Sequence, residues 1–460
     1  MLGTAGGIAG LQSAPAGAAA GLGKQASSYN PPVSVAKKSV LTWNTAAANS
    51  KLLSIIGSYP HPTGNTTRGI HGKTVTFGCI APNTNNGVAT VFQGFCQGAQ
   101  ARLNQANSQK SLPWKLKLTG SADSGSVQDT QNTDIIADVD TTKDFGLFIS
   151  AALGPIGTNV LESQHVPYFG DFTDCGKNSV FGFDIDYDIE TCAALESETS
   201  DKWLVYTDSF MKSYVKPLGI RLNQVRYAGL AYDQGTLLQY VHILESQIKA
   251  SGAKIVGNST SLPANSSSTV DLGPYVTPLI GDNPTVIGIY SADPTLTARL
   301  MGALQQAGYK GNVSAACDAS ELSNPTVAAE IDGCLATSIE NGYPSFGGKY
   351  WAVLAKEARH AHQTLNQGFI HGWFEADRAV QGMEGFAKTS KPLTSENLIN
   401  MMNNGWTYGG FGDVSAPQTF PYGKYNSSPC TALARESASK KKEVPYQDLT
   451  CAQVIYAPLS

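Results

Sequence analysis

Short apolar runs alternate with stretches of helical periodicity from about residue 73 onward. In the first half of the chain, strands are predicted at 73–80, 115–118, 145–150 and 166–169, and helices at 88–103 and 127–141. This βαβ order is typical of a parallel, doubly wound sheet with right-handed crossovers.

The alternation restarts after residue 225. Strands are predicted at 226–232, 254–256, 285–290 and 312–316, helices at 237–248, 294–307, 347–366 and 371–388, and a Ser/Asn-rich loop at 258–269. Two successive α/β units of similar size predict two lobes that face each other. Because ligands of open α/β sheets lie beyond the carboxyl ends of the strands, the loops after the strands are the candidate ligand contacts.

Charge and composition exclude one class of function and favour a compartment. The 32 Lys and Arg residues against 36 Asp and Glu residues give a formal net charge of −4, whereas nucleic-acid-binding proteins carry a basic excess. Charged residues make up only 15% of the chain, below the usual share of soluble domains. Asn, Gln, Ser, Thr and Tyr must therefore supply much of the polar surface, which favours an exported protein.

The eight cysteines stand as four successive pairs: Cys79 and Cys96, Cys175 and Cys192, Cys317 and Cys334, and Cys430 and Cys451. No CxxC motif occurs, which argues against zinc-ribbon and thioredoxin sites. The regular gaps favour four local disulfides formed in an oxidising compartment, with eight buried free thiols as the alternative. The basic run 440–442 is predicted to be a solvated turn between the last two cysteines.

The first 35 residues are rich in Gly and Ala and lack the basic and Leu-rich segments of a signal peptide. We expect residues 1–35 to form a flexible tether, with a signal peptide already removed. No run reaches the roughly 18 apolar residues that span a bilayer.

Motifs of common catalytic and nucleotide-binding sites are missing from the sequence. The segment 72–74 lacks the first glycine of a P-loop, and neither HExxH nor GxSxG is present. The alternating acids of 184–190 predict a solvated strand face or an inter-lobe crossing, with a calcium site or a carboxylate pair as the alternative. We therefore expect no metal, no cofactor and no catalytic residue.

Four segments stand out by their order and spacing: IAPNTNNG at 80–87, FISAALG at 148–154, VPYFGDFTD at 166–174 and GIYSAD at 288–293. Together they resemble the type I periplasmic solute-binding proteins, specifically the branched-chain-amino-acid-binding (Leu/Ile/Val-type) family of ABC transporters. The resemblance covers about residues 70–415. It implies an α/β fold of two Rossmann-like lobes with parallel sheets, joined by three hinge crossings and closing over a ligand.

The resemblance also implies where the lobes begin and end. Lobe one would hold residues 70–185 and 343–405, and lobe two residues 186–342 and 406–460. The crossings would fall near 183–190, 335–343 and 405–413.

Ligand contacts carry over by resemblance at positions in both lobes. The loop containing Ser150, Ala152, Leu153 and Gly154 would offer backbone N–H groups and a hydroxyl to a ligand carboxylate. The segment of Asp171, Phe172, Thr173 and Asp174 would complete the shell around the carboxylate and the amine, and Asn85 or Asn86 would lie over the ligand. From lobe two, the contacts would be Tyr232, Tyr290, Ser291 and Asp318.

Some of these residues have a second interpretation. Asp318 would pair with a ligand ammonium, but it equally suits the cap of the helix that follows it. Tyr232 and Tyr290 also suit packing within the lobe, and Phe172 suits the core. The acids of 171–174 replace the small hydroxyl residues usual in the family, which favours a cationic, amide or polyol-like ligand over leucine.

The expected function is therefore that of an extracytoplasmic solute-binding component of an ABC importer, in the periplasm or on the outer face of the cell membrane. Its ligand would be a small polar solute, an amino acid or a related amide or amine. The expected partner is an ABC permease, with no nucleic acid and with membrane attachment only through a lost lipid anchor. A ligand-sensing ectodomain of the same fold is the alternative, and an enzyme is a third class without support in the residues.

Overall fold

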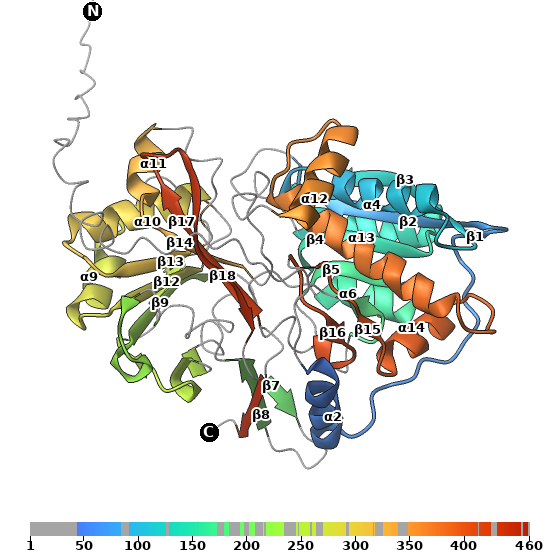
Figure 1. Ribbon diagram of the computed structural model, residues 1–460, viewed down its shortest axis with the longest axis horizontal. Helices are drawn as coiled ribbons and strands as arrows, with labels where there is room; N and C mark the ends of the chain where they lie inside the picture. The colour runs from blue at the N-terminus through green and yellow to red at the C-terminus, as the bar shows by residue number, and fades with distance from the viewer. Residues whose placement is uncertain are drawn as a thin grey trace, which may run out of the picture.

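The computed structural model describes residues 44–83, 92–125, 128–153, 155–172, 179–183, 194–196, 202–207, 215, 218–233, 245–246, 248–257, 260–263, 270–290, 294–315, 317, 325–338, 348–412, 414–424, 430–451 and 454–458. These residues form two α/β lobes that stand side by side (Figure 1). The predicted tether, residues 1–35, lies outside the described residues.

Lobe one is built on a six-stranded sheet. Its strands are β1 (Ile70–His71), β2 (Thr74–Ala81), β3 (Lys115–Asp123), β4 (Gly146–Leu153), β5 (Tyr168–Phe172) and β6 (Gly182–Phe183). The order is β1-β2-β4-β5-β6 with β3 beside β2, and every pairing except β1 with β2 is parallel. Strand β2 is buried along almost its whole length, which is why it reads as a continuous apolar run.

Helices cover both faces of this sheet, and two of them are packed unusually closely (Figure 1). The helices are α4 (Phe95–Gln109), α5 (Gln128–Ala137), α6 (Pro155–Ser163), α12 (Lys349–His360), α13 (Gln367–Phe386) and α14 (Ser395–Asn403). A Cβ atom at Gly98 of α4 would overlap the carbonyl oxygen of Phe369, and one at Gly372 of α13 would overlap that of Phe95. The two glycines therefore let the backbones of α4 and α13 touch.

Lobe two contains an eight-stranded sheet. Its strands are β9 (Arg226–Asp233), β10 (Lys254–Ile255), β11 (Thr260–Pro263), β12 (Val286–Tyr290), β13 (Asn312–Ala315), β14 (Leu335–Ser338), β17 (Cys430–Ser437) and β18 (Lys442–Cys451). The order is β10-β9-β12-β13-β14-β17-β18 with β11 beside β9. Pairings up to β14 are parallel, whereas β17 and β18 add an antiparallel hairpin. Helices α9 (Gly273–Gly281), α10 (Pro294–Gln306) and α11 (Pro325–Ile331) pack in this lobe.

The hairpin and β11 differ from the sequence-based expectation. The segment 258–269 was expected to be a loop, but 260–263 pairs with β9 as strand β11. The basic run forms the turn between β17 and β18, as predicted, but the flanking strands were not predicted.

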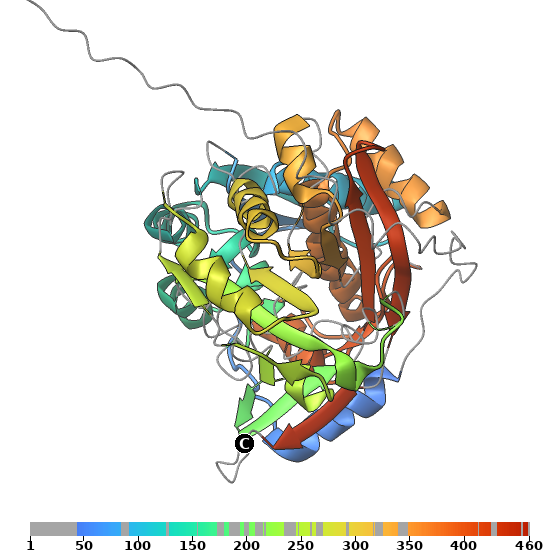
Figure 2. The ribbon, with the colours of Figure 1, turned by 90° about the vertical axis from the view of Figure 1, so that its left-hand side faces the viewer.

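A small third sheet lies below the two lobes (Figures 1 and 2). It consists of β7 (Ala194–Glu196), β8 (Lys202–Thr207) and β19 (Val454–Pro458), in the order β19-β8-β7 and all antiparallel. Judged from the described residues, the chain passes between the lobes three times: after β6, between β14 and α12, and between Lys424 and β17.

The third passage lies later in the chain than the expected crossing near 405–413. Strands β15 (Thr407–Tyr408) and β16 (Gln418–Thr419) pair with each other, and Tyr408 and Phe420 are fully buried in the core of lobe one. The hydroxyl of Tyr408 donates to the Asp377 carboxylate at 2.9 Å. Residues 407–424 therefore pack with lobe one, because their aromatic side chains complete its core.

The chain enters lobe one through an N-terminal arm, residues 44–69. The arm begins with helix α2 (Thr45–Ile56) and continues to Thr66, whose N–H and hydroxyl donate to the Glu396 carboxylate at 2.9 and 2.6 Å. His165 Nδ1 lies 2.6 Å from the same carboxylate. Burial raises the pKa of Glu396, but the hydrogen bonds from Thr66 and His165 outweigh it and lower the value to about 2.

Three of the predicted disulfides are present: Cys79–Cys96, Cys317–Cys334 and Cys430–Cys451. The first joins β2 to α4, and the third joins the open ends of the β17–β18 hairpin. The predicted pair Cys175 and Cys192 lies outside the described residues. The free-thiol alternative is therefore wrong for six of the eight cysteines.

Candidate functional site

The carboxyl ends of the lobe-one strands meet at one edge of the sheet. Strand β2 ends at Ala81, β4 at Leu153 and β5 at Phe172, and the parallel register pairs Ile80 with Ile149. The predicted ligand contacts Ser150, Ala152, Leu153, Asp171 and Phe172 therefore belong to two neighbouring strand ends.

The register between β4 and β5 is irregular at these residues. Ile149 pairs with Gly170, but the next pair is Leu153 with Phe172, so three residues of β4 stand opposite one residue of β5. Gly170 has a φ of 130°, and a Cβ atom there would overlap the Ile149 carbonyl oxygen, so the close approach requires glycine. Such irregularities interrupt the ladder of backbone hydrogen bonds beside many binding sites.

Ser150 offers a buried hydroxyl at this irregularity. The residue is fully buried, and its carbonyl oxygen accepts a hydrogen bond from Gln131 Nε2 of α5 at 3.2 Å. Its Oγ has no hydrogen-bond partner within the described part of the chain. A buried hydroxyl without a partner costs free energy, which a ligand group that hydrogen-bonds to it would recover.

Asp123, which the sequence analysis missed, holds the start of the first loop. Its Oδ1 accepts hydrogen bonds from the N–H groups of Asn83 at 2.7 Å and Gly125 at 3.0 Å. Asn83 directly precedes the segment with the predicted contacts Asn85 and Asn86. The sequence signal was an Asp at the end of a strand and two residues before a glycine, a pattern typical of Asx turns.

A second carboxylate, that of Asp134, interacts electrostatically with Asp123. Burial first, and then the charge of Asp123, raises the pKa of Asp134 on α5. The shift shows that the charge of Asp123, at the end of β3, is felt by the Asp134 carboxyl on α5.

Lobe two presents its strand ends in the same way. Strand β9 ends at Asp233 and β12 at Tyr290, and the register pairs Tyr290 with Ala231. The predicted contacts Tyr232 and Tyr290 therefore stand at the carboxyl ends of neighbouring strands.

Several predicted contacts lie outside the described residues: Asn85, Asn86, Gly154, Thr173, Asp174, Ser291 and Asp318. The acidic row 184–190 also lies outside them. Among the residues that are described, no group of three His, Cys, Asp or Glu side chains is arranged to hold a metal ion. No helix in the described ranges is both long and apolar enough to cross a bilayer.

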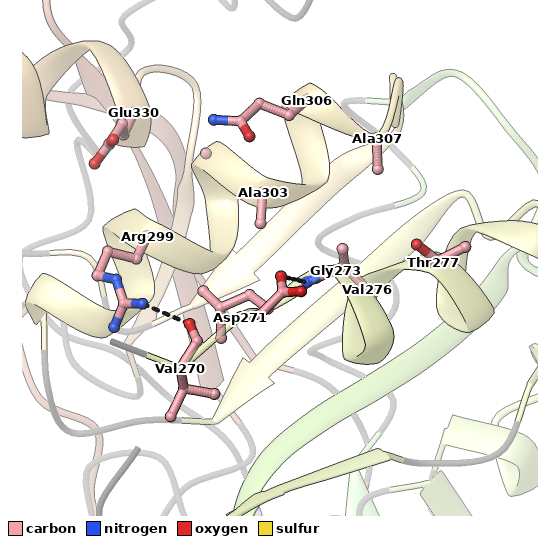
Figure 3. Close-up of a pocket in the computed structure, with 12 residues that line it drawn as sticks. Val270, Asp271, Gly273, Val276, Thr277, Arg299, Ala303, Gln306, Ala307 and Glu330 are labelled. Atoms are coloured by element: carbon pink, nitrogen blue, oxygen red, sulfur yellow. Dashed lines mark hydrogen bonds between the residues drawn. The ribbon is translucent and has the colours of Figure 1, made fainter. Parts of the chain in front are cut away.

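Two surface grooves contain none of the predicted contacts. One, of about 530 Å³, lies between α9, α10 and α11 of lobe two (Figure 3). On its wall, Arg299 donates to the carbonyl oxygen of Val270 at 3.0 Å, and burial raises the pKa of Glu330. The other, of about 630 Å³, lies between α4, α12 and β3 of lobe one. Each groove is formed by a single lobe.

The chain is similar to solved structures over most of its length. A fatty acid ABC transporter substrate-binding protein from Thermomonospora curvata has a TM-score of 0.62 at 15% identity, covering 84% of this chain and 95% of that one. An ABC transporter solute-binding protein from R. palustris in complex with 4-hydroxybenzoate has a TM-score of 0.61 at 13% identity, covering 83% and 98%. A branched chain amino acid ABC transporter protein from Thermus thermophilus with bound valine has a TM-score of 0.60 at 10% identity, covering 83% and 98%.

No family model matches the sequence, and the search of curated proteins found no match. At identities of 10 to 15%, the structural likeness shows the fold. The fold is the two-lobed α/β fold of the type I periplasmic solute-binding proteins, which confirms the predicted fold class.

Proposed function

We propose that this protein is the extracytoplasmic solute-binding component of an ABC importer. It captures a small polar solute between its lobes and presents the closed form to a permease. The observation that carries this proposal is the likeness to ABC transporter solute-binding proteins over more than four fifths of the chain. The three local disulfides support an oxidising compartment outside the cytoplasm.

The proposed ligand site lies between the carboxyl ends of the two parallel sheets. Lobe one contributes Ser150 and the end of β5, and lobe two the ends of β9 and β12. Closure buries the ligand by rotating the lobes about the chain passages between them. A ligand that binds the closed arrangement more tightly than the open one shifts the population of molecules toward the closed arrangement.

We propose an amino acid or a related amide or amine as the ligand. The neighbours whose names give a ligand differ from one another, with a fatty acid, 4-hydroxybenzoate and valine among them, so the chemistry of this chain must decide. We expect the acids predicted for the site, Asp171, Asp174 and Asp318, to supply negative charge for an ammonium or amide group. The Ser150 hydroxyl and nearby backbone N–H groups suit a carboxylate, because both charges of a buried zwitterion need partners.

A thermal-shift screen of amino acids, amides, polyamines, aromatic acids and fatty acids tests the proposal. A ligand at about a thousand times its Kd adds roughly 4 kcal/mol to the free energy of unfolding, which raises Tm measurably. Hits are then titrated by calorimetry, and we expect one ligand per chain. If no compound of these classes binds, that result would count against the proposed function.

Ser150→Ala tests the position of the site. Loss of one hydrogen bond should weaken binding of a screen hit about tenfold, while the ligand-free protein keeps its stability because no described residue hydrogen-bonds to the hydroxyl. Ser395→Ala is the matched control, since Ser395 is equally buried, also lacks a hydroxyl partner among the described residues, and begins the distant helix α14. Equal Kd values for wild type and Ser150→Ala would place the ligand elsewhere.

A further inference from the structure

The N-terminal arm packs where two segments of lobe one lead toward lobe two. Helix α2 is amphipathic: its buried residues are Thr45, Ala48, Asn49, Leu52, Ile55 and Ile56, which recur at helical spacing. The Asn44 side chain caps the helix by accepting a hydrogen bond from the Ala47 N–H at 3.0 Å. The helix is therefore a built element with one face committed to the rest of the protein.

The buried face of α2 binds the segment that precedes the third passage, residues 418–424. The Thr419 N–H donates to the Thr45 hydroxyl at 2.7 Å, and the Tyr422 N–H donates to Asn49 Oδ1 at 2.9 Å. Leu52 and its apolar neighbours on the helix form a separate small core with Tyr422. Two side chains of the arm thus satisfy backbone groups that would otherwise be buried without partners.

The same arm reaches the segment that precedes the first passage, residues 179–183. The Tyr59 hydroxyl donates to the Ser179 carbonyl oxygen at 3.2 Å. Lys424 Nζ donates to the same oxygen at 2.9 Å and to that of Val180 at 2.6 Å, and it lies 4.1 Å from the centre of the Phe183 ring. Lys424 is itself 5.3 Å from the Tyr59 ring centre.

Lys424 is buried, and Glu162 is the carboxylate that acts on its charge. Burial lowers the pKa of Lys424 well below its usual range, and Glu162 only partly opposes this. The Glu162 carboxylate instead accepts hydrogen bonds from the Tyr168 hydroxyl at 3.0 Å and from the Phe181 N–H at 2.9 Å. An ammonium held mainly by two carbonyl oxygens and aromatic rings depends on all of them staying in place.

Helix α2 lies next to the small third sheet of the protein. In both views, α2 lies beside the small sheet of β7, β8 and β19 (Figures 1 and 2). The arm therefore lies on the side of lobe one that faces this third sheet, although α2 is far from β7, β8 and β19 in the sequence.

We infer that α2 and Tyr59 form a hinge brace that ties residues 179–183 to residues 418–424. The brace makes the two segments move as one body with lobe one, and it thereby sets the balance between open and closed arrangements. The effect on lobe balance rests on the proposed hinge closure. The tie itself does not, and it can be measured without any ligand.

Hydrogen exchange of the full chain, with no ligand added, tests the brace through Asn49→Ala. The variant leaves the Tyr422 N–H without its acceptor, so exchange at 418–424 should rise at least fivefold. Coupling predicts a similar rise at the Phe181 amide, although Phe181 does not touch Asn49. Lys51→Ala on the exposed face of α2 is the matched control and should leave both segments as in wild type.

Tyr59→Phe serves as the second variant, since it removes only the hydroxyl that reaches Ser179. It should speed exchange at 179–183 and, through the brace, at 418–424. Small-angle scattering of the ligand-free variants should give a radius of gyration different from that of wild type and Lys51→Ala. The inference would be overturned if exchange became faster only in the segment that contacts the substituted residue. It would also be overturned if exchange rose in both 179–183 and 418–424 while the radius of gyration stayed that of wild type.

These outcomes separate the brace from the proposed function. A failed ligand screen would leave the exchange result intact. A failed exchange experiment would remove the brace without affecting ligand binding.

Discussion

Asp138 and Asp144 form a carboxylate pair against β2, and Asp138→Asn should stabilise the protein at neutral and alkaline pH. Asp138 begins the π-helical turn η1 (Asp138–Thr142) after α5. A Cβ atom at Gly78 would lie 2.5 Å from Asp138 Oδ2 and 3.2 Å from Asp144 Oδ2, so both carboxylates pack on the same bare stretch of backbone. Burial, followed by the charge of Asp144, raises the pKa of Asp138 to about 7.

The nearest cation does not neutralise the pair. Arg68 donates to the carbonyl oxygens of Asp144 at 2.9 Å and Val139 at 2.7 Å, and its charge lowers the pKa of Asp138 only in part. Asp144 accepts from the Thr119 hydroxyl at 2.5 Å. Ionising Asp138 therefore places a second negative charge beside a fully buried carboxylate.

The magnitude and sign follow from linkage. The folded protein holds the Asp138 proton up to about pH 7, whereas the unfolded chain loses it near pH 3.8. The contribution of Asp138 to the free energy of unfolding is therefore greatest below pH 3.8 and is lost as the pH rises to about 7. At about 1.4 kcal/mol per pH unit, the loss is at most about 4 kcal/mol. The amide of Asp138→Asn carries no charge and still offers an N–H donor to Asp144. We therefore expect the substitution to raise the free energy of unfolding by about 1 to 4 kcal/mol at pH 8.

Urea denaturation between pH 4 and pH 8, followed by tryptophan fluorescence, measures this gain. The difference between Asp138→Asn and wild type should grow from near zero at pH 4 to its full value above pH 7. Asp140→Asn is the control, because Asp140 is exposed on the same turn. A difference that is independent of pH, or a loss of stability at pH 8, would refute the coupled pair.

Three further predictions address the arm, the helix contact and the fourth disulfide. Glu396→Gln should destabilise the protein by about 1 to 3 kcal/mol at pH 7, and the difference from wild type should shrink as pH falls from 4.5 toward 2, as urea titrations would show. Gly98→Ala should lower Tm by several degrees, whereas Gly281→Ala, where a Cβ meets nothing within 4 Å, should not; equal melting curves would contradict the close contact of α4 and α13. Non-reducing peptide mapping should find Cys175 bonded to Cys192, and a crossed pairing would contradict the local scheme.

Long parallel strands such as β2 and β12 were predictable, because strands buried on both faces leave continuous apolar runs. The runs at 73–80 and 285–290 correspond to β2 and β12 within a residue or so at each end. Strands β17 and β18 were not predicted, because their sequences mix polar and charged residues with apolar ones and leave no continuous apolar run, although β17 is buried along most of its length.

Tertiary contacts decide the features that the sequence reasoning missed. Tyr408 and Phe420 lie in a Gly- and Pro-rich stretch, so their burial in lobe one has no periodic signal. Helix α2 does have helical spacing in Leu52, Ile55 and Ile56, but no local pattern tells which surface its apolar face covers. Asp123 acts on the backbone of a distant strand end, which only the sheet register reveals.

Small-angle scattering during a ligand titration tests the central claim, that the two lobes close over a solute. A hit from the thermal-shift screen is added to saturation, and the radius of gyration is followed at each concentration. Closure predicts a radius that decreases along the same binding curve that calorimetry reports. A saturated protein with an unchanged radius would contradict hinge closure as the mechanism.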